Sequence, residues 1–118
     1  MFESEMEIEG SIATFVRETR GNWDVLHVAG EVDLSNVREL EAELGRLGSS
    51  GSRHAALDLT RCTYLDSTGL HAIARAYQNR GKRLRIVVPE DGIRRVFKLT
   101  NLADTLGVVS RLDAPYAV

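Results

Sequence analysis

The feature that most constrains the fold is the order of strand-like and helix-like hydrophobic patterns along the chain. Two strand-like segments, 12–16 and 23–29, come first, and the turn signal Gly21-Asn22 lies between them. Helix-like and strand-like segments then alternate, which is typical of parallel strands joined by right-handed helical crossovers. The order β-β-α-β-α-β-α-β predicts a single α/β domain with a mixed, four- to five-stranded sheet and helices packed on it.

Three segments carry the spacing of amphipathic helices. The first begins at Ser35 or Asn36, and Asn36 with Glu39 has the spacing of a capping box. The second follows Ser67, which is a good N-cap residue, and the third begins at Ile93. The remaining strands are expected at 55–59, 84–88 and 108–109.

The same pattern divides the 118 residues into three parts. Residues 1–10 are acidic and are expected to form a flexible arm. Residues 11–112 are expected to form the folded domain, and residues 113–118 a short tail. A chain of this length supports one hydrophobic core without disulfides or metals.

Charge and composition exclude several functions. The net charge of −2 does not favour nucleic-acid or membrane-surface binding, which usually needs a basic field. No apolar run is long enough to span a membrane, and the acidic start lacks the features of a signal peptide, so a cytoplasmic location is expected. Cys62 is the only cysteine, and the three histidines are not at metal-ligand spacing. Neither a metal nor a cofactor is expected.

The most informative segment runs from Leu57 to Leu70, where a buried strand leads through a short turn into the helix that begins at Ser67. Ser67 has three possible roles: a plain N-cap, a phosphate acceptor beside the free N–H groups of the helix, or a nucleophile assisted by His71. Gly69 has no side chain, so a large partner can approach closely there. Asp58 is interpreted mainly as an anchor for the loop.

Three stretches at matching spacing resemble the STAS family, specifically the anti-sigma-factor antagonists. The apolar strand with an Asp stands here as Leu57-Asp58-Leu59, and the Asp-Ser-Ser/Thr-Gly-Leu signature as 66–70. The stretch 30–33 resembles the family's Gly-Glu-hydrophobic-Asp turn, and 93–102 resembles its third helix.

The resemblance implies a binding protein and not an enzyme. The unphosphorylated antagonist binds an anti-sigma factor that is also a serine kinase, which frees the sigma factor. The kinase then phosphorylates the serine after the Asp, which maps to Ser67, and a phosphatase resets the protein. Asp33 either contacts the kinase or starts the first helix, and Thr68 is a weaker candidate acceptor. The residues implied in partner binding are Asp33, Asp66, Ser67, Thr68, Gly69 and His71.

Two other functions stay open from the sequence. The chain could be a non-switching STAS accessory subunit of a transporter or of a stress-signalling scaffold. It could also be a small hydrolase that uses Ser67, although no Gly-x-Ser-x-Gly elbow is present.

Overall fold

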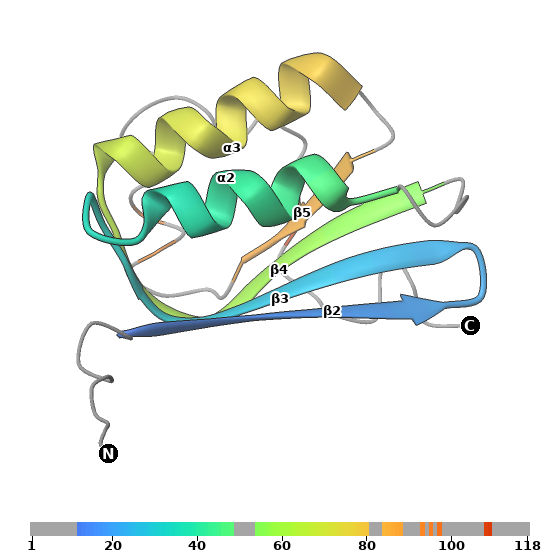
Figure 1. Cartoon of the computed structure of the whole chain (residues 1–118), viewed down its shortest axis with the longest axis horizontal. Coiled ribbons are helices and arrows are strands. Elements are labelled where there is room, and N and C mark those ends of the chain that lie inside the picture. Colours follow the sequence, from blue (N-terminus) through green and yellow to red (C-terminus); the bar gives the residue numbers. More distant parts are fainter. Residues whose placement is uncertain are drawn as a thin grey trace.

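The computed structural model describes residues 12–48, 54–80, 84–88, 93, 95, 97, 108 and 109. The expected arm and tail lie outside these residues, as does most of the third helix, of which Ile93, Arg95 and Phe97 are helical. The elements in chain order (Figure 1) are β2 (Ala13–Arg20), β3 (Trp23–Val32), α2 (Val37–Arg46), β4 (His54–Leu65), α3 (Ser67–Arg80), β5 (Leu84–Val87) and β6 (Val108–Val109).

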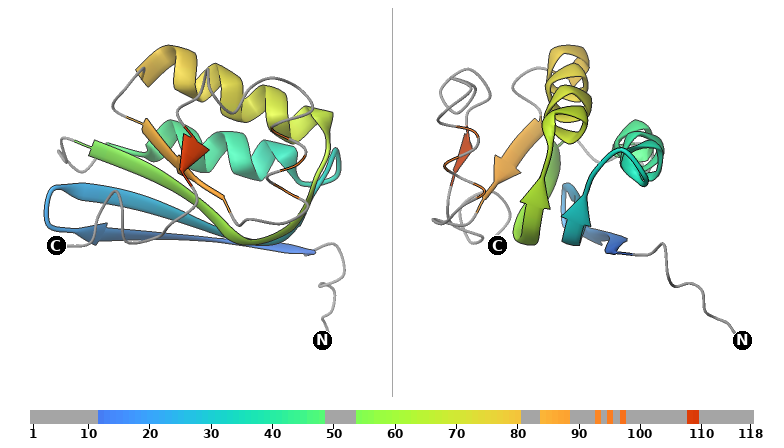
Figure 2. Two further views of the ribbon diagram at one scale, coloured as in Figure 1. Left: turned by 180° about the vertical axis from the view of Figure 1, so that it is seen from behind. Right: turned by 90° about the vertical axis from the view of Figure 1, so that its left-hand side faces the viewer.

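Within the described residues the sheet has five strands in the order β2-β3-β4-β5-β6, which confirms the predicted mixed α/β architecture. Strands β2 and β3 are antiparallel, whereas β3, β4, β5 and β6 run parallel to one another. Both α2 and α3 cover one face of the sheet and lie side by side (Figure 2). Each helix follows a parallel strand, so the carboxyl ends of β3 and β4 and the N-termini of both helices meet at one edge.

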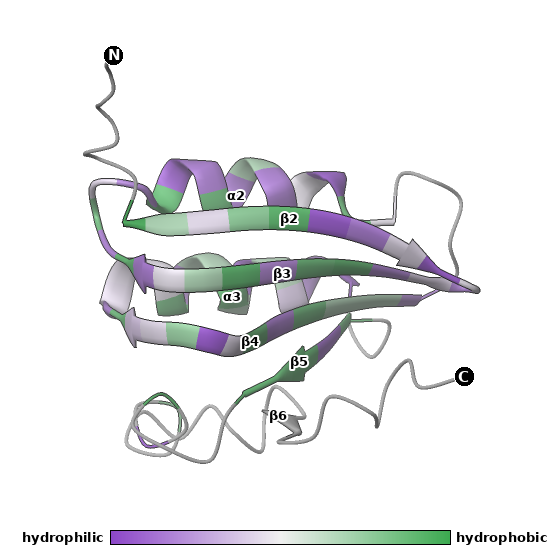
Figure 3. Cartoon of the chain, turned by 90° about the horizontal axis from the view of Figure 1, so that it is seen from below, coloured by the Kyte–Doolittle hydropathy of each residue, from purple (hydrophilic) through white to green (hydrophobic). Residues whose placement is uncertain are grey.

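The core lies between the helices and the central strands. Leu26, Leu57 and Ile86 are in register across β3, β4 and β5, and all three are fully buried. Leu40 of α2 and Ile73 of α3 complete the same hydrophobic cluster. Burying an aliphatic side chain of this size contributes about 1.5–3 kcal/mol to stability. Seen from the side away from the helices (Figure 3), β2 changes from hydrophobic to hydrophilic along its length, as expected for a strand at the sheet edge.

Strand β4 is longer than the sequence pattern predicted. It was expected to end near residue 59, but it continues to Leu65 and includes Cys62, which is buried in the core. The pairing of β3 with β4 shifts twice, between His27 and Ala29 and between Gly30 and Glu31. Each shift adds one residue to β4, which breaks the two-residue alternation from which strands are recognised.

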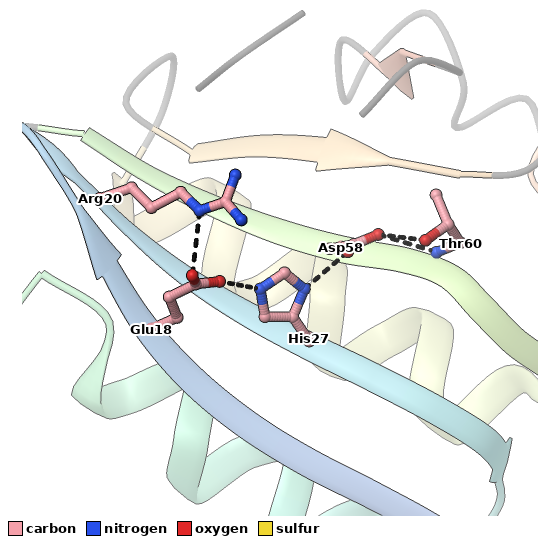
Figure 4. A network of polar contacts seen from close by, with 5 residues as sticks. All are labelled: Glu18, Arg20, His27, Asp58 and Thr60. Atoms are coloured by element: carbon pink, nitrogen blue, oxygen red, sulfur yellow. Dashed lines mark hydrogen bonds and ion pairs between the residues drawn. The ribbon is translucent and has the colours of Figure 1, made fainter. Parts of the chain in front are cut away.

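A polar network holds β4 where the first shift occurs (Figure 4). One carboxylate oxygen of the buried Asp58 accepts hydrogen bonds from the backbone N–H of Thr60 (3.0 Å) and from its hydroxyl (2.7 Å). The other oxygen lies 2.7 Å from Nδ1 of His27, and Nε2 of His27 lies 2.6 Å from Glu18. Asp58 is therefore an anchor, but it holds strand β4 and not the loop that was expected after residue 59, and its network joins three strands.

Glu18 completes the network on β2. Its pKa is lowered chiefly by the hydrogen bond with His27 and then by the hydrogen bond with Arg20, which is 3.0 Å away. Glu18 is therefore ionised at neutral pH, and it connects the edge strand to the anchored part of β4.

We expect Asp58→Ala to lower the free energy of unfolding by about 1–3 kcal/mol, because it leaves the part-buried N–H and hydroxyl of Thr60 without their acceptor. Asp58→Asn keeps an acceptor oxygen and should cost less. Urea unfolding of the three proteins measures the difference. Equal stability of Asp58→Ala and the wild type would show that the network does not hold the strand.

Candidate functional site

The β3–α2 and β4–α3 connections come together at the carboxyl edge of the sheet (Figure 1). The backbone N–H of Asp66 donates to the carbonyl of Val32 (3.2 Å), which joins the start of the second connection to the end of β3. The turn around Asp33 and the Asp66-Ser67-Thr68-Gly69 segment, which lie far apart in the sequence, are therefore neighbours.

Asp66 is the cap of α3. Its Oδ1 accepts hydrogen bonds from the backbone N–H groups of Thr68 (3.0 Å) and Gly69 (3.1 Å), and from the hydroxyl of Thr68 (2.6 Å). Its carbonyl accepts the N–H of Leu70 (3.1 Å). The expectation that Ser67 caps this helix is wrong: Ser67 is the first helical residue. Asp and Ser cap about equally well, so residue type alone does not choose between neighbours.

The charge of Asp66 is stabilised by this geometry. Partial burial alone would raise the pKa of its carboxyl group, but the hydrogen bonds from the Thr68 hydroxyl and from the N–H groups of Gly69, Thr68 and Leu34 outweigh burial and lower the pKa. Asp66 is consequently a carboxylate at neutral pH, and the Leu34 contribution links it to the β3–α2 loop.

Ser67 is left available by the aspartate cap. The residue is exposed, and within the described part of the chain its hydroxyl has no hydrogen-bond partner. The expectation that a phosphate there would meet unpaired N–H groups is not met at Thr68 and Gly69, because Asp66 already accepts from both. A phosphate on Ser67 would instead lie beside a carboxylate.

The β3–α2 loop is fixed by its own side chains. Asp33 accepts hydrogen bonds from the backbone N–H (2.9 Å) and hydroxyl (2.6 Å) of Ser35. Asn36 accepts from the N–H of Asp33 (3.0 Å) and donates to the carbonyl of Glu31 (2.9 Å). The predicted capping box is therefore absent, because the amide of Asn36 faces back into the loop and makes no cap hydrogen bond to α2.

Gly69 has a different role from the one inferred from the sequence. It is buried, and a Cβ at this position would lie 2.5 Å from Cδ1 of Leu65 and 3.2 Å from Cγ1 of Val32. The missing side chain thus faces the core and lets α3 pack closely on the ends of β3 and β4. The interpretation that Gly69 makes room for a partner was therefore wrong, because the missing side chain makes room for the core residues Leu65 and Val32.

The remaining expected site residues differ in accessibility. Thr68 is half-buried and its hydroxyl is used in the cap, whereas His71 lies exposed on α3. In the described part of the chain, no hydrogen bond joins His71 to Ser67, so the pairing needed for a nucleophile is not formed. Asn36 was expected at the start of the first helix, but its role in holding the loop was missed, as were the exposed side chains of Leu34 and Tyr64. An apolar residue inside the polar stretch 33–36 was a usable signal.

Among the described residues, no group of three or more His, Cys, Asp or Glu side chains is arranged to hold a metal ion. No helix in the same residues is long and apolar enough to cross a membrane.

The fold and this edge define a small α/β domain that presents an exposed serine at a capped helix start. Residues 15–110 match the family model described as "Mlab, STAS domain". The chain is 33% identical over 93 residues to the anti-sigma-B factor antagonist of Staphylococcus aureus (strain NCTC 8325 / PS 47), which covers 76% of this chain and 86% of the relative. The chain therefore belongs to the STAS-domain family of anti-sigma-factor antagonists.

Solved structures agree with this assignment. An anti-sigma factor antagonist from Mycobacterium paratuberculosis superposes with a TM-score of 0.79 and 28% identity, covering 86% of this chain and 88% of that one. The unphosphorylated antagonist SpoIIAA shares the fold, with a TM-score of 0.66 and 19% identity over 85% of this chain and 90% of that one. These relatives are named as regulatory antagonists, and the chain is a regulatory binding protein and not an enzyme.

We expect Asp66→Ala to lower the free energy of unfolding by about 1 kcal/mol at pH 7, because the helix loses its cap. Asp66→Asn keeps one acceptor oxygen and should cost less. The lowered pKa means that the charge of Asp66 stabilises the fold above a pH of about 4 and that this contribution is lost as the pH falls through the lowered value. The wild type should therefore be more stable than Asp66→Asn at pH 7, and the difference in their free energies of unfolding should shrink at acidic pH. A gap between them that stayed constant with pH would contradict the role given to the charge.

We expect Gly69→Ala to destabilise the protein by about 1–3 kcal/mol, since the added methyl group overlaps Leu65 in the packed core. Gly45→Ala is the matched control on α2, where nothing lies within 4 Å of the added Cβ. That change should stabilise the helix by about 0.5–1 kcal/mol. Thermal unfolding of both variants tests the packing role, and opposite signs are the expected result. A Gly69→Ala protein as stable as the wild type would rule that role out.

Proposed function

We propose that the chain is an anti-sigma-factor antagonist controlled by phosphorylation of Ser67. The unphosphorylated form binds an anti-sigma factor that is also a serine kinase, and the sigma factor is released. Phosphorylation of Ser67 ends this binding, and a protein phosphatase restores the active form. The observation that carries the proposal is an exposed Ser67 hydroxyl with no hydrogen-bond partner among the described residues, beside the capping carboxylate of Asp66.

The phosphoryl transfer needs little from this chain apart from access. The Ser67 oxygen attacks the terminal phosphorus of the kinase's bound nucleoside triphosphate, and the bond to the bridging oxygen breaks. The nucleoside diphosphate leaves with that bond's electron pair, while the hydroxyl proton passes to a base on the kinase. A hydroxyl engaged in capping would first have to give up its hydrogen bonds. Because Asp66 caps the helix, the Ser67 hydroxyl is available for attack.

The phosphate would act as an electrostatic switch at the interface. It adds about −1.5 to −2 charges at neutral pH, next to the ionised Asp66. In the complex it would also face the remaining phosphates of the nucleotide on the kinase. Like charges brought together at an interface cost several kcal/mol, and each ~1.4 kcal/mol is a tenfold loss of affinity. Release therefore requires no refolding of the antagonist.

The other expected site residues take different parts in this proposal. In this proposal His71, which is exposed, and Asp33, which is half-buried, contact the partner directly. Asp66, Thr68 and Gly69 mainly shape the helix start that presents Ser67. The partners are the anti-sigma factor serine kinase and the phosphatase, with neither nucleic acid nor membrane involved, and the cytoplasm is the proposed location.

A non-switching accessory subunit of a transporter or of a stress-signalling scaffold is the alternative within the same fold. Such a subunit has no need for an unengaged serine hydroxyl at the helix start, so the accessibility of Ser67 favours the switch. The alternative gains support if Ser67 is never modified in the cell.

We expect phosphopeptide mass spectrometry on the chain purified from its host to find phosphate on Ser67 and to find that its amount changes between growth and stress. Ser67→Ala should abolish the signal, which separates Ser67 from the half-buried Thr68. Detection on Thr68 alone, or no phosphate under any condition, would contradict the proposed switch.

A further inference from the structure

Exposed apolar side chains concentrate at the edge that holds Ser67. Among the described residues, the exposed large hydrophobic side chains are Ile12 (40% exposed), Val16 (57%), Leu34 (74%) and Tyr64 (50%). Leu34 lies in the β3–α2 loop, and Tyr64 lies two residues before the cap Asp66. The carbonyl of Ile12 accepts the N–H of Glu31 (2.8 Å), so Ile12 borders the same end of β3. We call Ile12, Leu34 and Tyr64 the apolar edge patch.

Leu34 is exposed although its loop is tightly held. The residues on either side of it, Asp33 and Ser35, are hydrogen-bonded to each other, and Asn36 ties the loop back to Glu31. The N–H of Leu34 also contributes to stabilising the Asp66 carboxylate. A side chain presented by an ordered backbone loses little conformational freedom on binding, so most of its contact energy is available for affinity.

Tyr64 extends the patch across the end of the sheet. It lies in register with Glu31 of β3, and its neighbour Leu65 is buried in the core. A tyrosine anchored in a strand offers a large, rigid, amphipathic contact area, and this residue type is enriched among the residues that dominate binding energy. Half of the Tyr64 side chain is exposed to water, so much of its apolar surface is not used in the core and is available to a partner.

We propose that the apolar edge patch is the main contact for the anti-sigma factor, which inserts its own apolar side chains around Leu34 and Tyr64. This inference rests on the proposed function, and it gives the patch and Ser67 separate roles in binding. The patch supplies affinity in both phosphorylation states, whereas Ser67 supplies the change in affinity.

The charge around the patch narrows the choice of partner. The segments 31–36 and 63–69 contain the carboxylates Glu31, Asp33 and Asp66 and no Lys, Arg or His. A partner surface with Arg or Lys around an apolar centre is complementary to this edge. A second copy of this chain would bring the same carboxylates face to face, so self-association through the patch is disfavoured.

Site-specific photocross-linking in the host tests the contact. The full chain carries benzoylphenylalanine at position 34, 64 or 16, and each cross-linked product is identified by mass spectrometry. Val16 is the matched control, because it is equally exposed but lies in the middle of β2 opposite His27. Positions 34 and 64 should cross-link to an anti-sigma factor, and position 16 should not.

Affinity measurements with the anti-sigma factor so identified complete the test. Leu34→Ser and Tyr64→Ser should each weaken binding at least tenfold, with Val16→Ser unchanged. Unfolding curves confirm that the variants stay folded, as expected for exposed positions. Phosphorylation alone should weaken binding to the anti-sigma factor, and Leu34→Ser should lower the affinity of the phosphorylated chain by the same factor as that of the unphosphorylated chain.

The outcomes separate the two proposals. If the tagged wild-type chain recovers an anti-sigma factor but positions 34 and 64 neither cross-link nor affect affinity, the patch is refuted and the proposed function stands. If the wild-type chain recovers no anti-sigma factor, the proposed function fails, and the patch with it. Cross-links from 34 or 64 to another copy of this chain would assign the patch to self-association instead.

Discussion

The interaction on which the site depends is the cap that the Asp66 carboxylate forms on α3. One oxygen accepts three hydrogen bonds from Thr68 and Gly69, and the backbone of the same residue is bonded to Val32. The cap therefore ends β4, starts α3 and joins both to the end of β3. Because Asp66 accepts the N–H groups at the helix start, the hydroxyl of Ser67 is not needed as a cap. The accessibility of the serine follows from the aspartate that precedes it.

The same local chemistry recurs where regular structure is interrupted. Asp33, Asp58 and Asp66 each accept hydrogen bonds from both the N–H and the hydroxyl of a Ser or Thr two residues later. Asp and Asn commonly form such turns, which offer the backbone a partner outside a helix or a ladder. In this chain the three turns lie at the end of β3, at a shift in β4 and at the start of α3. Two of them shape the site directly, and the third bends the strand that leads to it.

The fold could be predicted from the sequence in those segments where the hydrophobic residues keep a regular spacing. Alternating helical and strand patterns predicted the element order and core positions such as Leu57 and Ile73, because burial imposes a regular spacing on those segments. The full length of β4 was not predictable, because two inserted residues disrupt its alternation. The choice between Asp66 and Ser67 as cap also escaped prediction, since both types cap well and the decision depends on where β4 meets Val32. The role of Gly69 depends on Leu65 and Val32, a tertiary contact that no local pattern contains.

The electrostatics of the helix start favour a proposed phosphorylation of Ser67 that would act on binding and leave the fold intact. A negative group at a helix N-terminus gains about 0.3–1 kcal/mol from the helix dipole. A phosphate on Ser67 would lie beside the Asp66 carboxylate, and two unit charges about 4 Å apart in water repel by about 1 kcal/mol. The two effects are of similar size and opposite sign, so they largely cancel in the free protein. In a complex the water that screens the repulsion is excluded, while the dipole term is already present in the free protein. The discrimination between the two states must therefore arise where a partner covers this edge.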